Sequence, residues 1–193
     1  AVPVYGGHAA PTALQRLEAV RGDGTPAVVI VLYGNRAYER AVRELADFVT
    51  ARGFVPVAAA AFVGEHSYST ARWPIASGRP DAADRADAEA FGRAVAAKLA
   101  AEGVRAVDAA QLPAVRNGML ATWRFIRFVI GYRRRQKRHP QRVTVAASAD
   151  RCTHCGRCAS LCPTGAIVAG GEERTDTERC IRCCACVKGC PVG

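Results

Sequence analysis

The first 151 of the 193 residues contain no cysteine, and all nine cysteines lie between Cys152 and Cys190. An odd number in so short a segment argues against a secreted disulfide scaffold, in which paired cysteines are spread along the chain. The sequence also lacks any uncharged apolar stretch of about 18 residues, which excludes a transmembrane helix, and it opens without a signal-peptide pattern. We therefore expect a reducing, cytoplasmic setting in which thiolates bind metal.

Acidic residues are few compared with basic ones, 17 against 27, so that the formal net charge is +10. Residues 121–142 contain no acid and carry eight of these positive charges: Arg124, Arg127, Arg133, Arg134, Arg135, Lys137, Arg138 and Arg142. Trp123, Ile126 and Ile130 recur there at helical spacing. The pattern predicts an amphipathic helix that frays into a basic tail.

The chain divides by pattern into residues 1–112, a basic connector over 113–149, and a cysteine module over 150–193. The continuous β-branched run at 27–33 predicts a strand buried on both faces, as in a parallel sheet. Residues 54–63 predict a second strand. Because Pro56 lacks an amide donor, this strand either lies at an edge or begins near residue 57. Residues 2–5 look like the end of a third strand.

Three helices are expected at 12–21, 37–52 and 82–102. The last has the clearest signals, with Asp81 as N-cap, Asp84 in the first turn and Gly103 as the stop. Asp81, Asp84 and Asp87 are thereby interpreted as a helix start and a solvated face. Strands that alternate with helices of this length predict an α/β fold with a parallel sheet.

The cysteine module contains one motif twice, at an offset of 28 residues. Each copy reads C-x2-C-x2-C-x3-C-P, the run in which two [4Fe–4S] clusters exchange their fourth ligands. Three thiolates at steps of three residues can wrap one cubane, and the fourth crosses to the other. One cluster is assigned Cys152, Cys155, Cys158 and Cys190. The other is assigned Cys180, Cys183, Cys186 and Cys162.

Zinc is the weaker interpretation, because a tetrahedral site has no use for a three-cysteine loop with a distant fourth ligand. Cys184 is the extra thiol. It corresponds to Gly156 in the first copy, and we interpret it as a small buried residue rather than a spare ligand. His154 is interpreted as a surface residue of the first loop, with tuning of the cluster potential as the alternative.

Residues 150–193 resemble the bacterial-type two-cluster ferredoxin domain. The resemblance implies low-potential electron transfer, one electron per cluster. After Cys162-Pro163 the sequence continues into an apolar run at 164–168, whereas only Val192 and Gly193 follow Pro191. We therefore expect the chain to lack the final strand of this domain.

Two glycine loops follow predicted strands in the first part of the chain. Gly6-Gly7 comes after Tyr5, and Gly34-Asn35 comes after Tyr33. Ligands of open α/β sheets bind outside the carboxyl ends of strands. The loops are equally well interpreted as ordinary turns or as two walls around a flat ring.

The segments 3–7, 33–38 and 62–67 resemble the later half of a flavodoxin-like domain. The whole chain resembles the flavodoxin–ferredoxin fusion proteins of anaerobic bacteria, the EFR-type ferredoxins. That resemblance implies a doubly wound parallel sheet that binds FMN. The matching FMN contacts are Tyr5, Gly6, Gly7, Tyr33, Gly34, Asn35, Arg36 and Tyr38.

The phosphate loop and the first strands of a flavodoxin have no counterpart here, so that a sheet of order 2-1-3-4-5 would lack its centre. We therefore predict that this chain alone binds FMN weakly or not at all. His66, in the loop to Ser69, is expected near the same sheet edge in a packing or capping role. We identify no catalytic residues, and an oxidoreductase activity beyond electron carriage stays open.

Two function classes remain. The first is an electron carrier that links FMN to the clusters, with an acidic redox partner docking near residues 124–142. The second is a nucleic-acid-binding protein with a structural metal, Fe–S or zinc, in which the basic run 133–138 and His139 contact phosphates. Peripheral membrane contact through residues 119–138 is compatible with the first class.

Overall fold

The structure is a computed structural model and describes residues 1–113, 118–138 and 149–192. The chain divides into two compact units, Ala1–Arg116 and Asn117–Gly193. Parts of the expected connector, including His139 and Arg142, lie outside the described residues.

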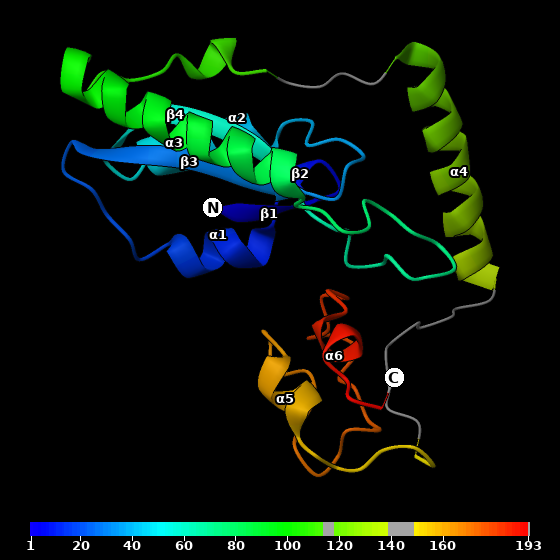
Figure 1. Cartoon of the computed structure of the whole chain (residues 1–193). Helices are drawn as coiled ribbons and strands as arrows, with labels where there is room; N and C mark the ends of the chain where they lie inside the picture. The colour runs from blue at the N-terminus through cyan, green and yellow to red at the C-terminus, as the bar shows by residue number, and fades with distance from the viewer. Residues whose placement is uncertain (114–117, 139–148, 193) are drawn as a thin grey trace. The chain divides into compact units, whose positions relative to one another are not determined.

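The first unit is an α/β fold around a four-stranded sheet of order β2-β1-β3-β4 (Figure 1). β1 pairs in parallel with β3, and β3 pairs in parallel with β4, whereas β2 runs antiparallel to β1. The three predicted strands are therefore parallel, whereas β2, which was not predicted, makes the sheet mixed. The strands are β1 Val2–Tyr5, β2 His8–Ala9, β3 Thr25–Tyr33 and β4 Phe54–Val63.

The antiparallel pairing comes from a two-residue hairpin turn. Tyr5 pairs with His8, and the intervening Gly6 and Gly7 both have positive φ, 60° and 88°. Such turns require positive φ at both central positions, which glycine supplies without steric cost. The predicted strand 54–63 lies at the edge of the sheet, as Pro56 indicated.

One face of the sheet holds the core. Val29 and Val31 are buried there with residues of α2, which spans Ala41–Thr50. The helix α1, which spans Pro11–Leu17, packs against the same cluster. α3, Ala82–Glu102, lies on the other face, where Phe91 meets Phe62 edge-on with ring centroids 5.7 Å apart.

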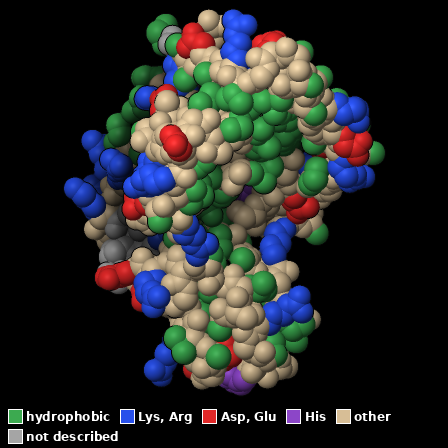
Figure 2. Space-filling model, turned by 90° about the vertical axis from the view of Figure 1, so that its left-hand side faces the viewer, with side chains coloured by type: hydrophobic (Ala, Val, Ile, Leu, Met, Phe, Trp, Pro, Cys, Tyr) green, Lys and Arg blue, Asp and Glu red, His purple; other side chains and the backbone are tan. Residues whose placement is uncertain are grey.

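The second face is only partly covered. Val28 and Leu32 on β3 are 39% and 46% exposed. The prediction that this strand is buried on both faces is therefore wrong, because α3 covers β4 rather than β3. Figure 2 shows hydrophobic side chains gathered into a continuous area on the first unit, with basic side chains around it.

Helix limits depend on local capping. α3 begins and ends where predicted. The Asp81 carboxylate accepts a hydrogen bond from the amide of Asp84, the Asp84 carboxylate accepts one from the amide of Asp81, and Gly103 follows the helix. α2 begins at residue 41 rather than 37, because Asn35 and Glu39 have positive φ. A short 3₁₀ turn, η1, spans Ala109–Gln111.

The second unit contains α4, Met119–Arg138, and the cysteine module. α4 stays helical through the basic residues 133–138, and the rest of the predicted basic tail, residues 139–142, lies outside the described residues. Among the described helices, none combines the length and apolar character needed to cross a bilayer.

The cysteine module has two short helices, α5 Arg157–Leu161 and α6 Ala185–Lys188, which pack on each other. Ile167 forms an antiparallel bridge with Thr175. Within the described part of this module, the buried side chains are Ala166, Ile167 and Glu172.

Candidate iron–sulfur centres

The two cysteine loops have the same backbone conformation. His154 and its counterpart Arg182 have φ of 51° and 57°, and Gly156 and its counterpart Cys184 have φ of 69° and 58°. In each loop, one left-handed residue directly precedes the second cysteine and another directly follows it, and both turn the chain sharply. The sequence repeat is therefore also a structural repeat, with the three cysteines of each loop wound in the same way.

A short helix carries each loop toward the other half of the module. α5 and α6 begin directly after the left-handed residues Gly156 and Cys184. Gly189, just past α6, lies so close to Leu161 at the end of α5 that a Cβ at residue 189 would collide with it. This close approach brings the segment that precedes Cys190 against the helix that contains Cys158.

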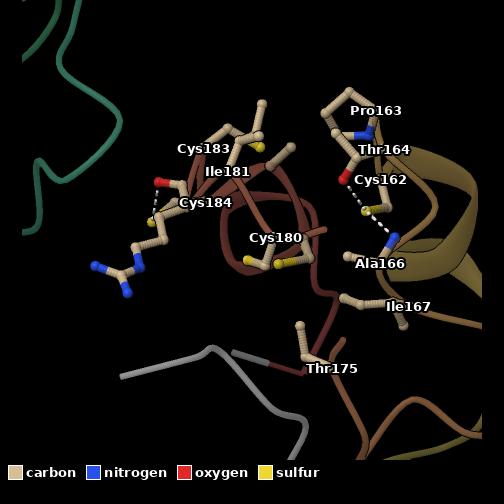
Figure 3. A pocket seen from close by; sticks show the side chains of 13 residues that line it. Cys162, Pro163, Thr164, Ala166, Ile167, Thr175, Cys180, Ile181, Cys183 and Cys184 are labelled. Atoms are coloured by element: carbon tan, nitrogen blue, oxygen red, sulfur yellow. Dashed lines mark hydrogen bonds between the residues drawn. The ribbon is translucent and has the colours of Figure 1, made fainter. Parts of the chain in front are cut away.

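Four of the predicted ligands share one pocket (Figure 3). Cys180, Cys183 and Cys186 come from the second loop, and Cys162 comes from the end of α5. Pro163, Thr164, Ala166, Ile167 and Thr175 form other parts of the lining. The grouping combines three thiols of one repeat with the fourth thiol of the other repeat.

The sulfur of Cys162 is surrounded by hydrogen-bond donors. The amide of Ala166 donates to Cys162 Sγ at 3.1 Å, and the Thr164 hydroxyl lies 3.8 Å from the same sulfur (Figure 3). Burial raises the pKa of this thiol, but hydrogen bonds from Thr164 and the amides of Ala166 and Ile167 outweigh burial, so that the pKa is lowered overall. These contacts favour the thiolate form of Cys162.

Two other thiols of this pocket have shifts in the opposite direction. Burial raises the pKa of Cys184 and of Cys186. Burial likewise raises the pKa of Cys158 in the first loop. A bound iron cluster would supply positive charge that stabilises such thiolates.

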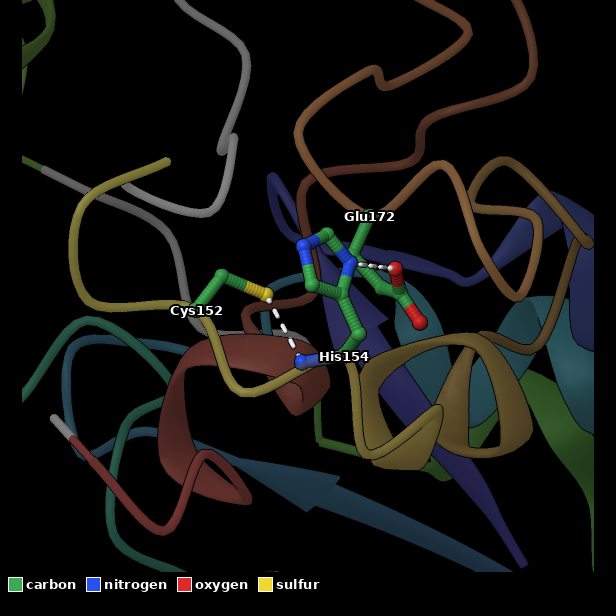
Figure 4. Close-up of side chains that lie close together, drawn as sticks. All are labelled: Cys152, His154 and Glu172. Atoms are coloured by element: carbon green, nitrogen blue, oxygen red, sulfur yellow. Dashed lines mark hydrogen bonds and ion pairs between the residues drawn. The ribbon is translucent and has the colours of Figure 1, made fainter.

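The first loop is ordered by a buried carboxylate (Figure 4). Glu172 is only 1% exposed; it accepts from the Gly170 amide at 3.1 Å, and its other oxygen lies 3.0 Å from His154 Nδ1. The hydrogen bond from His154 is the main reason that the pKa of Glu172 falls to about 2. The amide of His154 in turn donates to Cys152 Sγ at 3.4 Å.

Cys152, His154 and Glu172 place one ligand atom each within 4.8 Å of one another. The thiol of Cys152 is half-buried, and that of Cys155 is exposed. Sequence reasoning did not identify Glu172, because the burial of a loop carboxylate depends on its tertiary surroundings. His154 remains at the surface, as predicted, with its side chain 56% exposed.

None of the nine cysteines, all of which lie in the described residues, forms a disulfide. Cys184 lies on the lining of the Cys162 pocket. Its sulfur contacts the carbonyl oxygen of Arg182 at 3.8 Å. It therefore lies close enough to the ligand set for its role to require a direct test.

The predicted FMN contacts lie at the carboxyl ends of two adjacent parallel strands. Tyr5 ends β1 and is 38% exposed, and Tyr33 ends β3 and meets Tyr38 edge-on at 5.3 Å. The two loops touch, because the amide of Arg40 donates to Gly7 O at 3.0 Å and Glu39 fills the space beside Gly7. Gly6, Asn35 and Arg36 lie in the same two loops, and Arg36 pairs with Glu39 at 2.8 Å.

His66 lies at the same edge in a packing role. Its ring lies so close to Gly34 that a Cβ at residue 34 would collide with it. The amide of Tyr68 donates to His66 Nδ1 at 3.0 Å, which caps the turn.

Comparison with known proteins bears on the cysteine module. Residues 144–191 match the family described as 4Fe-4S dicluster domain. No curated protein and no solved structure gives a significant match to the chain. The repeated thiol loops and this match together identify a ferredoxin-type iron–sulfur domain, of the kind that carries out electron transfer, at the C-terminal end of the described chain.

Proposed function

We propose that the cysteine module transfers electrons through two [4Fe–4S] clusters with exchanged fourth ligands. Cys152, Cys155, Cys158 and Cys190 hold one cluster, and Cys180, Cys183, Cys186 and Cys162 hold the other. The observation that carries the proposal is the pocket where Cys162 meets the three thiols of the second loop. Each cluster, when bound, accepts and releases one electron.

The residues around the thiols are suited to binding iron–sulfur clusters. Thiolates are the ligands of iron–sulfur clusters, and amides that donate to their sulfurs tune the reduction potential. Ala166 supplies such an amide to Cys162, and His154 supplies one to Cys152.

Iron counting tests the exchange of ligands. The chain reconstituted without oxygen should contain roughly eight iron and eight sulfide. The variant Cys180→Ser/Cys183→Ser should keep about half of each. Adding Cys162→Ser to that variant should remove no further iron, because Cys162 already belongs to the lost cluster.

Two results would overturn the assignment. If Cys162→Ser removes the remaining iron from the double variant, Cys162 binds with the first loop. If the chain contains zinc and no sulfide, electron transfer is wrong. Cys190→Ser in the double variant is the matched comparison, and it should remove the remaining cluster.

We also propose that the edge formed by β1 and β3 is part of a flavin site that feeds the clusters. The support is the juxtaposition of the Tyr5 and Tyr33 loops at one sheet edge. FMN carries two electrons and can release them singly, which would link a two-electron donor to one-electron clusters. An acidic redox partner docking near residues 124–142 would complete the chain of transfer.

FMN titration tests this second proposal. We expect no saturable quenching of flavin fluorescence by this chain at micromolar concentration, because no phosphate loop is present. Chemical-shift changes at Tyr5, Tyr33 and Asn35 at high FMN concentration would support the site. Changes confined to other residues would contradict it.

A further inference from the structure

α4 exposes large apolar side chains along most of its length. The exposed fraction is 54% for Trp123, 66% for Phe128 and 48% for Tyr132. Met119, Leu120, Phe125, Ile126 and Ile130 are also exposed. A helix buried within a protein core would hide these side chains, so α4 requires another apolar surrounding.

The basic side chains of α4 gather on one side. At 100° per residue, Arg124, Arg127 and Arg138 fall within a narrow sector, and Arg134 and Arg135 border it, giving a width of about 100°. From residue 119 to 132, the rest of the circumference is apolar apart from Thr122. Arg133 and Lys137 interrupt the apolar sector only in the last turns.

Two side-chain contacts organise the surface of α4, one between the basic and apolar sectors and one within the apolar sector. The guanidinium of Arg127 lies over the ring of Trp123, 4.7 Å from its centroid. Phe128 and Tyr132 stack one turn apart, with centroids 6.3 Å apart. An indole beside a cation and a phenol at the end of an apolar sector are typical of helices at a lipid–water boundary.

The charge of α4 has one sign. The helix contains seven Lys and Arg residues and no acid, and three of its cations lie in the last turn: Arg135, Lys137 and Arg138. Such a helix cannot pair with a copy of itself through charges, and it is too polar to span a bilayer. Anionic lipid headgroups complement it, because each nearby cation contributes about 1 kcal/mol of attraction.

We propose that α4 lies in the interface of an anionic membrane. Trp123, Phe125 and Phe128 enter the boundary between headgroups and acyl chains, and Arg124 and Arg127 extend to the lipid phosphates. The basic residues 133–138 follow along the headgroup layer. The inference is independent of the proposed electron transfer, since it rests on exposed side chains outside the cysteine module.

The test uses all 193 residues of this chain, loaded with clusters, in a Trp73→Phe background, so that fluorescence reports on Trp123. It is mixed with vesicles of phosphatidylcholine, with or without phosphatidylglycerol. We expect cosedimentation and a blue shift with the anionic vesicles. The variant Phe125→Ala/Phe128→Ala should bind about tenfold or more weakly.

Two variants separate the contributions to binding. Arg133→Gln/Arg134→Gln/Arg135→Gln should reduce the preference for anionic over neutral vesicles about a hundredfold. Val168→Ala removes an apolar side chain that is 70% exposed elsewhere, and it should bind as the parent does. Unchanged iron content and ellipticity show that each variant folds.

Three outcomes would overturn the proposal. One is the absence of vesicle binding. Another is binding that ignores Phe125→Ala/Phe128→Ala and disappears in high salt, which would indicate an acidic protein or nucleic acid. The third is a dimer, seen by light scattering, that hides Trp123 and excludes vesicles.

Discussion

Cys184 adopts a backbone conformation that glycine adopts more easily. Its φ of 58° is matched by 69° at Gly156, the equivalent position of the other loop. A non-glycine residue in the left-handed region costs about 1–2 kcal/mol. The two positions therefore offer reciprocal substitutions.

We predict that Cys184→Gly leaves the iron content unchanged and stabilises the module by about 1 kcal/mol, because it removes this cost. Gly156→Cys should destabilise the first loop by a similar amount. Denaturant midpoints of cluster loss measure both effects. A drop in iron content for Cys184→Gly would instead identify Cys184 as a ligand.

Asp84 links the start of α3 to Arg79 through a two-point ion pair. The hydrogen bonds from Arg79 lower the pKa of Asp84 from 3.8 to about 2. A carboxyl with a lowered pKa in the folded state stabilises that state above its unfolded pKa. This stabilisation is lost as the pH falls from about 3.8 towards 2.

The corresponding variant is Asp84→Asn. Amides at the start of α3 should exchange hydrogen faster in the variant than in the parent at pH 6. The difference should shrink as the pH falls towards 2, where about half of the parent carboxyls are protonated and neutral, like the amide of the variant. Asp87→Asn, on the exposed face, is the control, and a pH-independent difference for Asp84→Asn would contradict the ion-pair explanation.

At the scale of elements, α3 depends on its cap more than on burial. Within α3, no residue is fully buried, and its anchors on the sheet are the Phe91–Phe62 contact and a hydrogen bond from Lys98 Nζ to Val57 O at 2.7 Å. A helix with so little burial depends for a larger share of its stability on interactions within the helix and at its cap.

Asp81→Ala should therefore destabilise α3 by about 1 kcal/mol, because it leaves the Asp84 amide without its acceptor. Hydrogen exchange across residues 82–102, in the absence of denaturant, measures the loss. Asp81→Asn or Asp81→Ser should restore most of the protection, since both cap helices well. Equal losses in all three variants would contradict a capping role.

Local signals explain which elements were predictable. α3 was predicted to the residue because Asp81, Asp84 and Gly103 mark its ends. β2 was missed because a two-residue strand carries no periodic pattern. The burial of β3 was overestimated, since a β-branched run does not reveal which face a later helix covers.

The same reasoning applies to the candidate site. The repeat spacing predicted that Cys162 would join the second loop, and the structure places these thiols around one pocket. The spacing does not encode the support from Glu172, which arises when residues 170–172 fold back onto the first loop. The assignment of each thiol to a cluster stays a prediction until iron is counted.

At the scale of the whole molecule, the folds of the two units are stabilised in different ways. The first has a cluster of buried apolar side chains between its sheet and α2. The described cysteine module buries only Ala166 and Ile167 among its hydrophobic residues. So small an apolar core cannot offset the entropy of ordering the chain, so metal coordination must supply the difference.

We predict that removing iron unfolds the cysteine module and leaves the first unit intact. Hydrogen exchange should rise throughout residues 150–192, while the amides of β3 and β4 keep their protection. Reconstitution with iron and sulfide should reverse the change. A module that stays protected without iron would show that its side chains alone are sufficient.

The scarcity of buried side chains in this module also bears on the life of the chain after synthesis. Until iron and sulfide arrive, we expect the cysteine module to be open to proteases and the sheet unit to resist them. If so, the abundance of intact chains should follow the supply of iron.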